Sequence, residues 1–162
     1  MIYSTPSDCP YYLITRASLS VTSLLKQELA NSGIRNVKPA YLGVLMCLWT
    51  SDSMDETLGK FGTNDGMRVA ELGRCAGLEP STMTGLVDRM ERDGLVYRTN
   101  DPLDRRALKV NLTEKGLHVR DLVFNAVVRM LENAFSGIET DEMEVAKKVL
   151  SQVLVNTKKG SN

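Results

Sequence analysis

The chain has 162 residues, of which 43% are hydrophobic and 25% are charged. These values are typical of a single globular domain, and they exclude a wholly disordered or collagen-like chain. The chain contains 20 basic and 20 acidic residues, so its formal net charge is zero. Composition alone therefore gives no support for a nucleic-acid partner, and any positive binding surface has to be local.

The charge is nevertheless segregated along the chain. Residues 98–120 include six basic and three acidic side chains, whereas residues 51–66 include one basic and four acidic side chains. The first stretch has a formal charge of +3 and the second a formal charge of −3. If the chain has a local positive surface, it is expected in residues 98–120.

The three cysteines, Cys9, Cys47 and Cys75, are an odd number and lack the spacing of metal ligands. No signal-peptide pattern opens the chain, so we expect a reduced, cytoplasmic protein without a metal or cofactor. Cys47 and Cys75 are expected to be small buried side chains. No stretch approaches the ~18 consecutive apolar residues of a spanning helix, which predicts that the protein is not in a membrane.

Two helices are predicted in the first third of the chain. Apolar residues recur at spacings of three and four over residues 11–31, and Gly33 is suited to end this helix. A second, mostly apolar helix is predicted to begin near Pro39 and to lie at the centre of the fold. The polar, glycine-containing residues 51–66 are expected to form a loop with one helical turn, and the sequence does not indicate its role.

A helix, a tight turn and a second helix follow. Residues 67–76 have helical periodicity, Gly77 begins the turn, and a new helix is predicted to begin at Pro80 and to end at Gly94. The second helix has one apolar face, so polar and small side chains occupy its open face. These residues are Ser81, Thr82, Thr84, Gly85, Asp88, Arg89 and Arg92. We expect Arg92 to pair with neighbouring acidic residues on the helix surface.

A hairpin and two further helices complete the chain. Residues 95–99 and 108–112 have strand-like patterns, and the turn-rich residues between them predict a hairpin with a charged tip. Thr113 is a plausible N-cap for a long helix that runs to about residue 135. Thr140 can cap a last helix, which has acidic residues in its first turn and an apolar side beyond it.

This order of elements is the layout of a winged helix-turn-helix. The second helix of the motif fits a major groove ~12 Å wide, and short hydroxyl side chains near its N-terminus can reach base edges or phosphates. An arginine-tipped hairpin can enter the narrower minor groove, whose negative potential attracts guanidinium groups. The layout therefore favours binding to double-stranded DNA.

Three motifs resemble the MarR family of bacterial regulators. They are Leu86-Val87-Asp88-Arg89-Met90-Glu91-Arg92-Asp93-Gly94-Leu95-Val96, then Asp101-Pro102-Leu103-Asp104-Arg105-Arg106-Ala107, and then Leu112-Thr113-Glu114-Lys115-Gly116. The resemblance covers most of the chain. It implies one mainly α domain with a small β wing over residues 1–162, with a winged lobe at 67–112 and intertwined dimerisation helices at 11–50 and 114–157.

The resemblance also implies roles for individual residues. In the family, the aspartate of the wing's Asp-x-Arg motif holds the arginine by a salt bridge, so Asp104 is expected to orient Arg106. The expected DNA-binding residues are Ser81, Thr82, Thr84, Arg89, Asp104, Arg105 and Arg106. Gly85 departs from the family's pattern, since many relatives have a larger polar or basic residue there.

Two kinds of signal could release such a regulator from DNA. Many relatives bind small aromatic effectors between the dimerisation helices and the winged lobe, where Tyr12, Arg16, Tyr41 and His118 are candidate contacts. For each residue taken alone, an ordinary interface or surface role is the favoured alternative. A thiol-sensing branch has a reactive cysteine near the first helix, which makes Cys9 a candidate redox site.

No catalytic constellation is recognisable, because His118 is the only histidine and no nucleophile elbow, phosphate loop or zinc motif is present. We therefore predict that the chain is not an enzyme but a homodimeric transcriptional regulator, with repression expected, that binds a pseudo-palindromic operator. The alternative is a winged-helix interaction module that no longer binds DNA, which the zero net charge and Gly85 favour.

Overall fold

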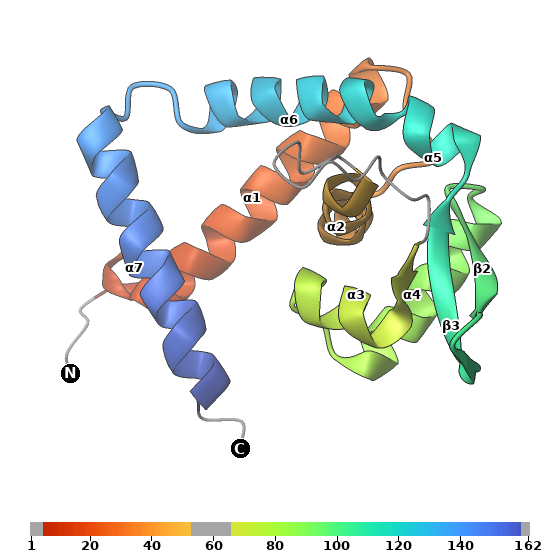
Figure 1. Ribbon diagram of the computed structural model, residues 1–162. Helices are drawn as coiled ribbons and strands as arrows, with labels where there is room; N and C mark the ends of the chain where they lie inside the picture. The colour runs from red at the N-terminus through yellow and green to blue at the C-terminus, as the bar shows by residue number, and fades with distance from the viewer. Residues whose placement is uncertain (1–4, 53–65, 160–162) are drawn as a thin grey trace. The chain divides into compact units, whose positions relative to one another are not determined.

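The computed structural model describes residues 5–52 and 66–159, which are mainly helical with one small antiparallel sheet (Figure 1). This confirms the predicted fold class of helices with a β wing. The chain divides into two compact units, Met1–Met130 and Leu131–Asn162. The loop predicted over residues 51–66 falls largely outside the described ranges. None of the described helices is long and apolar enough to cross a membrane.

The helices lie close to their predicted positions. The first unit contains the short 3-10 turns η1 (Pro6–Asp8) and η2 (Pro39–Tyr41) and the helices α1 (Pro10–Asn31), α2 (Leu42–Asp52), α3 (Val69–Ala76), α4 (Pro80–Arg92) and α5 (Glu114–His118). Helix α6 (Arg120–Ala134) runs across the boundary between the units, and α7 (Thr140–Lys159) belongs to the second. Pro39 opens η2, which leads directly into α2.

Helix α2 is at the centre of the first unit, as its apolar sequence predicts. Val44, Leu45 and Trp49 are buried. The indole Nε1 of Trp49 donates a hydrogen bond to the carbonyl oxygen of Gly116 at 3.0 Å, and its ring lies 5.6 Å from that of Phe124. Because an apolar helix gains most when it is enclosed on several sides, this placement accounts for its nearly continuous run of hydrophobic residues.

The sheet has three antiparallel strands in the order β1-β3-β2. They are β1 (Met67–Arg68), β2 (Val96–Asp101) and β3 (Asp104–Leu112). The predicted hairpin is confirmed as β2 and β3, but the helix predicted from residue 67 begins two residues later. Met67 and Arg68 instead pair with Val110 and Lys109 of β3, because this edge offers free backbone groups that two extended residues can satisfy.

The long helix predicted after Thr113 is interrupted. Thr113 is the N-cap of α5, since its Oγ1 accepts a hydrogen bond from the Gly116 N–H at 3.0 Å. Val119, with ψ of −8°, is the C-cap of α5, and α6 starts at the next residue. Gly116 lies so close to the carbonyl oxygen of Leu95 that a Cβ there would overlap it. Helix α5 is thereby held at the base of the wing, and the break lets α6 take its own direction.

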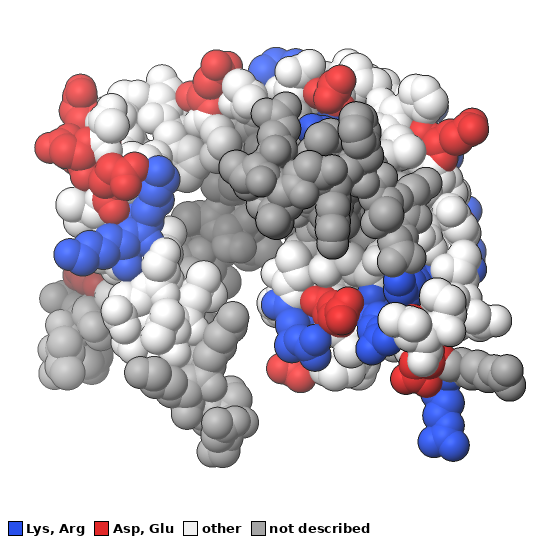
Figure 2. All heavy atoms as spheres, viewed as in Figure 1, with Lys and Arg blue, Asp and Glu red and all other residues white. Residues whose placement is uncertain are grey.

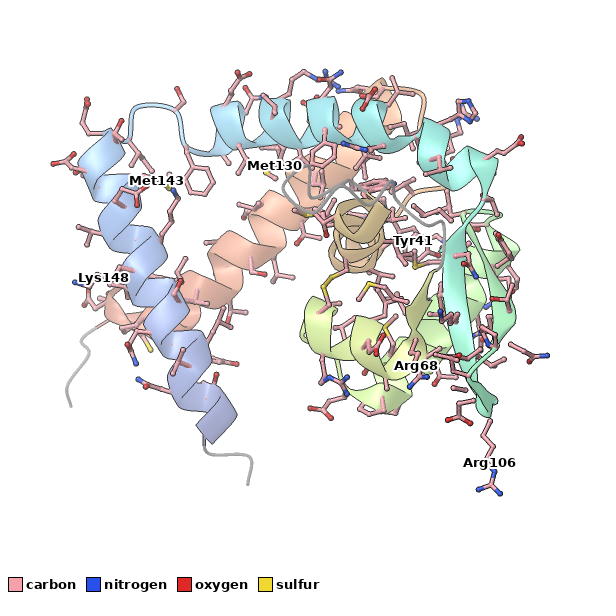
Figure 3. All side chains as sticks on the ribbon, in the orientation of Figure 1. Tyr41, Arg68, Arg106, Met130, Met143 and Lys148 are labelled. Carbon is pink, nitrogen blue, oxygen red and sulfur yellow. A yellow bond between two sulfur atoms is a disulfide. The ribbon has the colours of Figure 1, made fainter. Side chains whose placement is uncertain are left out.

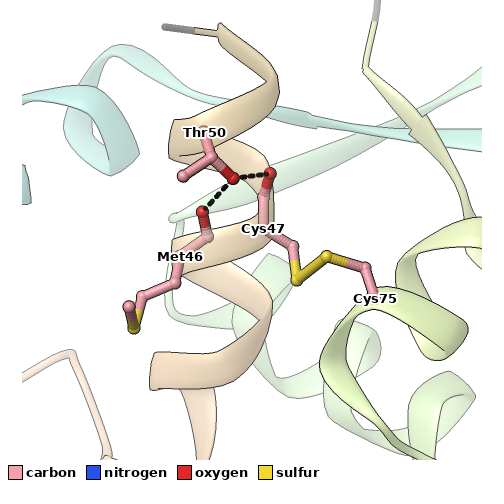
Figure 4. Close-up of a disulfide and its surroundings, with 4 residues drawn as sticks. All are labelled: Met46, Cys47, Thr50 and Cys75. Atoms are coloured by element: carbon pink, nitrogen blue, oxygen red, sulfur yellow. Dashed lines mark hydrogen bonds between the residues drawn. A yellow bond between two sulfur atoms is a disulfide. The ribbon is translucent and has the colours of Figure 1, made fainter.

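The expectation that Cys47 and Cys75 are separate buried thiols is wrong, because they form a disulfide between α2 and α3 (Figure 4). Their positions are 28 residues apart in sequence, and their Cα atoms lie 6.2 Å apart. Pattern and spacing could not reveal this pairing, since it depends on how two helices pack. Cys9 is a free cysteine.

The second unit contains the end of α6 and the helix α7. Six large apolar side chains of α7 are exposed within the described chain: Val145, Val149, Leu150, Val153, Leu154 and Val155. Asp141 and Glu142 lie in the first turn of the helix, where negative charge interacts favourably with the helix dipole. The apolar side predicted for this helix is therefore present and uncovered.

Candidate nucleic-acid interface

A tight turn joins α3 to α4. Gly77 adopts a left-handed conformation with φ of +66°, which an L side chain rarely tolerates, and the Leu78 N–H donates to the Gly73 carbonyl at 2.9 Å. A Cβ on Gly73 would approach the Leu78 carbonyl oxygen to 3.3 Å, so a small residue is needed where the turn folds back. The predicted helix-turn-helix is confirmed.

Helix α4 presents its polar face to solvent. Met83, Leu86, Val87 and Met90 are buried, whereas Ser81, Thr82, Thr84 and Arg89 are exposed. The Thr84 hydroxyl donates to the Pro80 carbonyl at 3.1 Å. Within the described residues, no hydrogen bond or ion pair engages the Arg89 side chain. It lies back along the helix, with Nη1 at 3.5 Å from the position that a Cβ on Gly85 would take.

The acidic side chains of α4 pair with residues outside the helix. Arg98 of β2 donates from Nη2 to Asp88 Oδ1 at 2.5 Å and from Nη1 to Glu91 Oε2 at 2.6 Å. Among the described residues Arg92 forms no ion pair with Asp88 or Glu91; its Nε donates to the Asp88 carbonyl oxygen at 3.3 Å, and its charge helps to lower the pKa of Asp93. Because Arg98 neutralises two carboxylates of α4, the free Arg89 is left as a positive group on the exposed face.

A second cluster anchors the end of α4. The hydroxyl of Tyr41 donates to Asp93 Oδ2 at 2.6 Å, and Lys38 Nζ donates to the same oxygen at 2.9 Å. The hydrogen bonds from Tyr41 and Lys38 lower the pKa of the Asp93 carboxyl. Asp93 is the C-cap residue of α4, so this cluster ties α4 to the turn that precedes α2.

The wing tip presents Arg106 to solvent. Figure 3 shows Arg106 extending away from the end of the hairpin. The salt bridge expected between Asp104 and Arg106 is replaced by a backbone contact, in which Asp104 Oδ1 accepts from the Arg106 N–H at 3.0 Å. The side chain of Arg105 lies outside the described part of the structure.

Sequence reasoning missed the ion pair that fixes the wing. The Asp101 side chain is fully buried, its Oδ2 accepts from Arg68 Nε at 2.5 Å, and its Oδ1 accepts from the Leu103 N–H at 2.8 Å. The hydrogen bond from Arg68, followed by that from Leu103, lowers the pKa of the Asp101 carboxyl. The two residues are 33 positions apart in sequence, and only the pairing of β1 with β3 brings Arg68 into reach.

A groove of about 1040 Å³ separates α4 from the wing. Its lining includes Arg68, Thr84 and Arg98 with Arg106, and apolar side chains from α3 and β3 line the remainder. Figure 2 shows basic and acidic side chains interspersed over α3, α4 and the wing rather than a uniformly basic surface. The structure therefore brings Thr84 and Arg106, predicted from separate motifs, to one groove.

The candidate effector residues lie on three separate elements. Tyr12 and Arg16 are exposed on α1, and His118 on α5 is exposed with Nδ1 at 2.6 Å from the Glu114 carbonyl oxygen. Tyr41 is completely buried and bonded to Asp93. Neither the groove beside α4 nor a smaller one of about 370 Å³ beside Arg129 is lined by any of the four. Among the described residues, no cluster of three or more potential metal ligands exists.

Comparison with known proteins supports a family assignment. Residues 39–108, which include α2, the helix-turn-helix and most of the wing, match the model of the MarR family. The chain is 29% identical over 82 residues to an uncharacterized HTH-type transcriptional regulator, YkoM, of Bacillus subtilis. This match covers 51% of the chain and 53% of the relative, so it spans only about half the length of each protein.

Solved structures share the fold over nearly the whole chain. The PcaV transcriptional regulator of Streptomyces coelicolor, in complex with its natural ligand, aligns with a TM-score of 0.77 and 22% identity over 94% of this chain and 96% of that one. Sco3205, a MarR-family regulator from the same organism in complex with DNA, aligns with a TM-score of 0.72 and 20% identity over 93% and 88%. At 22% and 20% identity, these similarities establish a shared fold only.

Proposed function

We propose that the chain is a MarR-family transcriptional regulator that binds a pseudo-palindromic DNA operator as a homodimer. In this proposal α4 is the recognition helix and the β2–β3 hairpin is the wing. The regulator represses or remodels transcription from a site near its own gene or its targets and has no catalytic activity.

The observation that carries the proposal is the arrangement of free and neutralised charges beside the groove. Asp88 and Glu91 point their carboxylates at Arg98, and Asp93 is held by Tyr41 and Lys38. Most of the negative charge of α4 is thus neutralised by ion pairs and hydrogen bonds. An isolated net-neutral protein can bind a polyanion when its acidic groups are paired internally and its unpaired cations face one side.

The two elements suit two different grooves of DNA. Ser81 and Thr82 at the start of α4 are short and exposed, so they can approach phosphates or base edges while Arg89 reaches further along the helix. Arg106 at the wing tip is suited to the minor groove or its phosphates. Arg105, Asp104 and Thr84 complete the proposed DNA-binding set, with Asp104 shaping the turn rather than contacting DNA.

Exposed apolar side chains support a homodimer. Tyr11, Leu13 and Leu19 of α1 are at least half exposed, and the large apolar residues of α7 are exposed as well. Exposed large apolar side chains of this kind, on described helices that cannot span a membrane, support an interface with a second copy. A two-fold dimer would place its recognition helices ~34–36 Å apart, one turn of DNA.

An effector completes the proposal. The PcaV structure contains that protein's natural ligand. We propose that a small aromatic molecule likewise binds this chain and controls its DNA binding, and that the chain acts in the cytoplasm. Such a ligand would weaken DNA binding only by favouring a conformation that does not fit the operator. Tyr12, Arg16, Tyr41 and His118 remain candidate contacts, although Tyr41 would first have to leave Asp93.

Fluorescence anisotropy with DNA from upstream of the protein's own gene, and with a scrambled duplex, tests the proposal. We expect tight binding to the first duplex only, with affinity that falls steeply between about 50 and 200 mM salt because phosphate contacts release counterions. Equal and weak binding to both duplexes would favour the interaction-module alternative.

A further inference from the structure

The disulfide between Cys47 and Cys75 has no role in the DNA-binding site described above. It joins α2 to the last turn of α3 (Figure 4). Cys47 is only 7% exposed, whereas Cys75 is exposed and is the more accessible of the two residues. A thiol or peroxide from solvent would therefore meet Cys75 first.

Helices α2 and α3 also contact each other outside the disulfide. Gly43 lies one turn before Cys47 on α2, and Ala76 follows Cys75 on α3. A Cβ placed on Gly43 would lie 3.9 Å from both the Cβ and the carbonyl oxygen of Ala76, which is ordinary van der Waals contact. Because α2 and α3 contact each other beyond the two sulfur atoms, we expect the reduced thiols to stay close enough to bond again.

The segment that contains η2 and α2 holds the helix-turn-helix at two points. One is the disulfide at the end of α3, and the other is the pair of hydrogen bonds from Tyr41 and Lys38 to Asp93 at the end of α4. Reduction would remove the first and leave the second. The end of α3 would then be free to shift against α2, and α4 packs directly on α3 through Met83 and Gly73.

We propose that Cys47 and Cys75 form a reversible thiol–disulfide site, oxidised by hydroperoxides, whose closure strengthens operator binding by fixing the recognition helix on α2. The effect on DNA rests on the proposed function. A fixed helix loses less conformational freedom when it binds, so the oxidised form pays a smaller entropic cost.

The oxidation is balanced with one hydroperoxide. The sulfur of Cys75 attacks the distal peroxide oxygen, the O–O bond breaks, and an alcohol or water leaves, so Cys75 becomes a sulfenic acid. The sulfur of Cys47 then displaces this oxygen, and the two remaining protons leave with it as water. Two thiols are oxidised and one peroxide is reduced, and a dithiol reductant reverses the change.

The test uses the full chain, which is reduced with dithiothreitol and then desalted. One sample is left reduced, and the other is oxidised with cumene hydroperoxide. Mass mapping under non-reducing conditions should find Cys47 joined to Cys75 within one chain. Oxidation should tighten binding to the operator duplex about fivefold in the wild type and in Cys9→Ser. Cys47→Ser/Cys75→Ser should bind equally in both states. The proposal is overturned if oxidation does not tighten binding by the wild type, or weakens it. It is also overturned if the response disappears in Cys9→Ser or persists in the double variant.

A second readout separates this proposal from the proposed function. Hydrogen exchange at the backbone amides of α3 can be measured without DNA. Oxidation should slow this exchange in the wild type but not in Cys75→Ser. The single variant also replaces the double variant as the control if the double variant does not fold. Slowed exchange without operator binding in either state would reject DNA binding and retain the thiol–disulfide site. Unchanged exchange in the wild type would reject the site itself.

Discussion

Asp101 at the end of β2 accepts a hydrogen bond on Oδ2 from Arg68 Nε, at 2.5 Å, and so joins the wing tip to the residue that precedes α3. The carboxylate is fully buried, and its other oxygen holds the Leu103 N–H. The same ion pair therefore sets the position of the wing relative to the helix-turn-helix.

We predict that Asp101→Asn weakens operator binding although Asp101 is inaccessible to DNA. The amide keeps the shape of the side chain but loses the charge that holds Arg68, so the wing is less well fixed. Asp121→Asn is the matched control, because Asp121 is exposed on α6 and does not line the groove beside α4. Anisotropy titrations of both variants check the result, and equal affinities for the two would contradict the positioning role.

The stability of the protein should fall at acid pH through the same residue. Hydrogen bonds lower the pKa of Asp101 below the ordinary value of about 3.9. Its contribution is therefore present above that value and is lost as pH falls through the lowered pKa of the folded state. Asp93, whose pKa is also lowered, should contribute in the same sense. Urea unfolding between about pH 6 and pH 3 should show a shallower loss of stability in Asp101→Asn than in the wild type.

Arg98 should affect DNA binding without contacting DNA. Arg98→Ala would release the carboxylates of Asp88 and Glu91 beside the proposed interface, where they would repel phosphates. Arg98→Lys should restore little, because one ammonium group cannot reproduce the two-pronged contact of the guanidinium. The triple variant Arg98→Ala/Asp88→Asn/Glu91→Gln should recover part of the operator affinity that Arg98→Ala loses. A full loss in that variant would show that Arg98 binds DNA directly.

Two helical glycines should respond to alanine in opposite ways. At Gly116 a Cβ would overlap the carbonyl oxygen of Leu95, so Gly116→Ala should be strongly destabilising. At Gly43 the nearest atoms lie at 3.9 Å, so Gly43→Ala should gain up to about 1 kcal/mol of helix propensity. Thermal unfolding of the two variants measures both effects, and a stable Gly116→Ala protein would contradict the close approach at Leu95.

Local patterns predicted the features that depend on neighbouring residues. The buried and exposed faces of α4 follow from helical periodicity, the cap at Thr113 from its hydroxyl, and the wing from alternating residues. The same reasoning placed Thr84, Arg89 and Arg106 on exposed positions.

Features that join distant segments could not be predicted in this way. The contacts of Arg68 with Asp101 and of Cys47 with Cys75 depend on tertiary packing, and neither leaves a periodic signal. The break between α5 and α6 at Val119 leaves no signal in a continuous helical pattern. Pairing of Asp88 with Arg98 likewise required β2 to lie beside α4.

The most direct test of the central claim is operator binding by Arg105→Ala/Arg106→Ala, with Lys147→Ala/Lys148→Ala on α7 as the charge-matched control. Size-exclusion chromatography first establishes that both variants keep the oligomeric state of the wild type. We predict that the wing variant loses sequence-selective binding in the anisotropy assay and that the control binds as the wild type does, because the wing cations belong to the proposed DNA-binding set and Lys147 and Lys148 do not. Unchanged binding by a wing variant that is still correctly assembled would contradict the account.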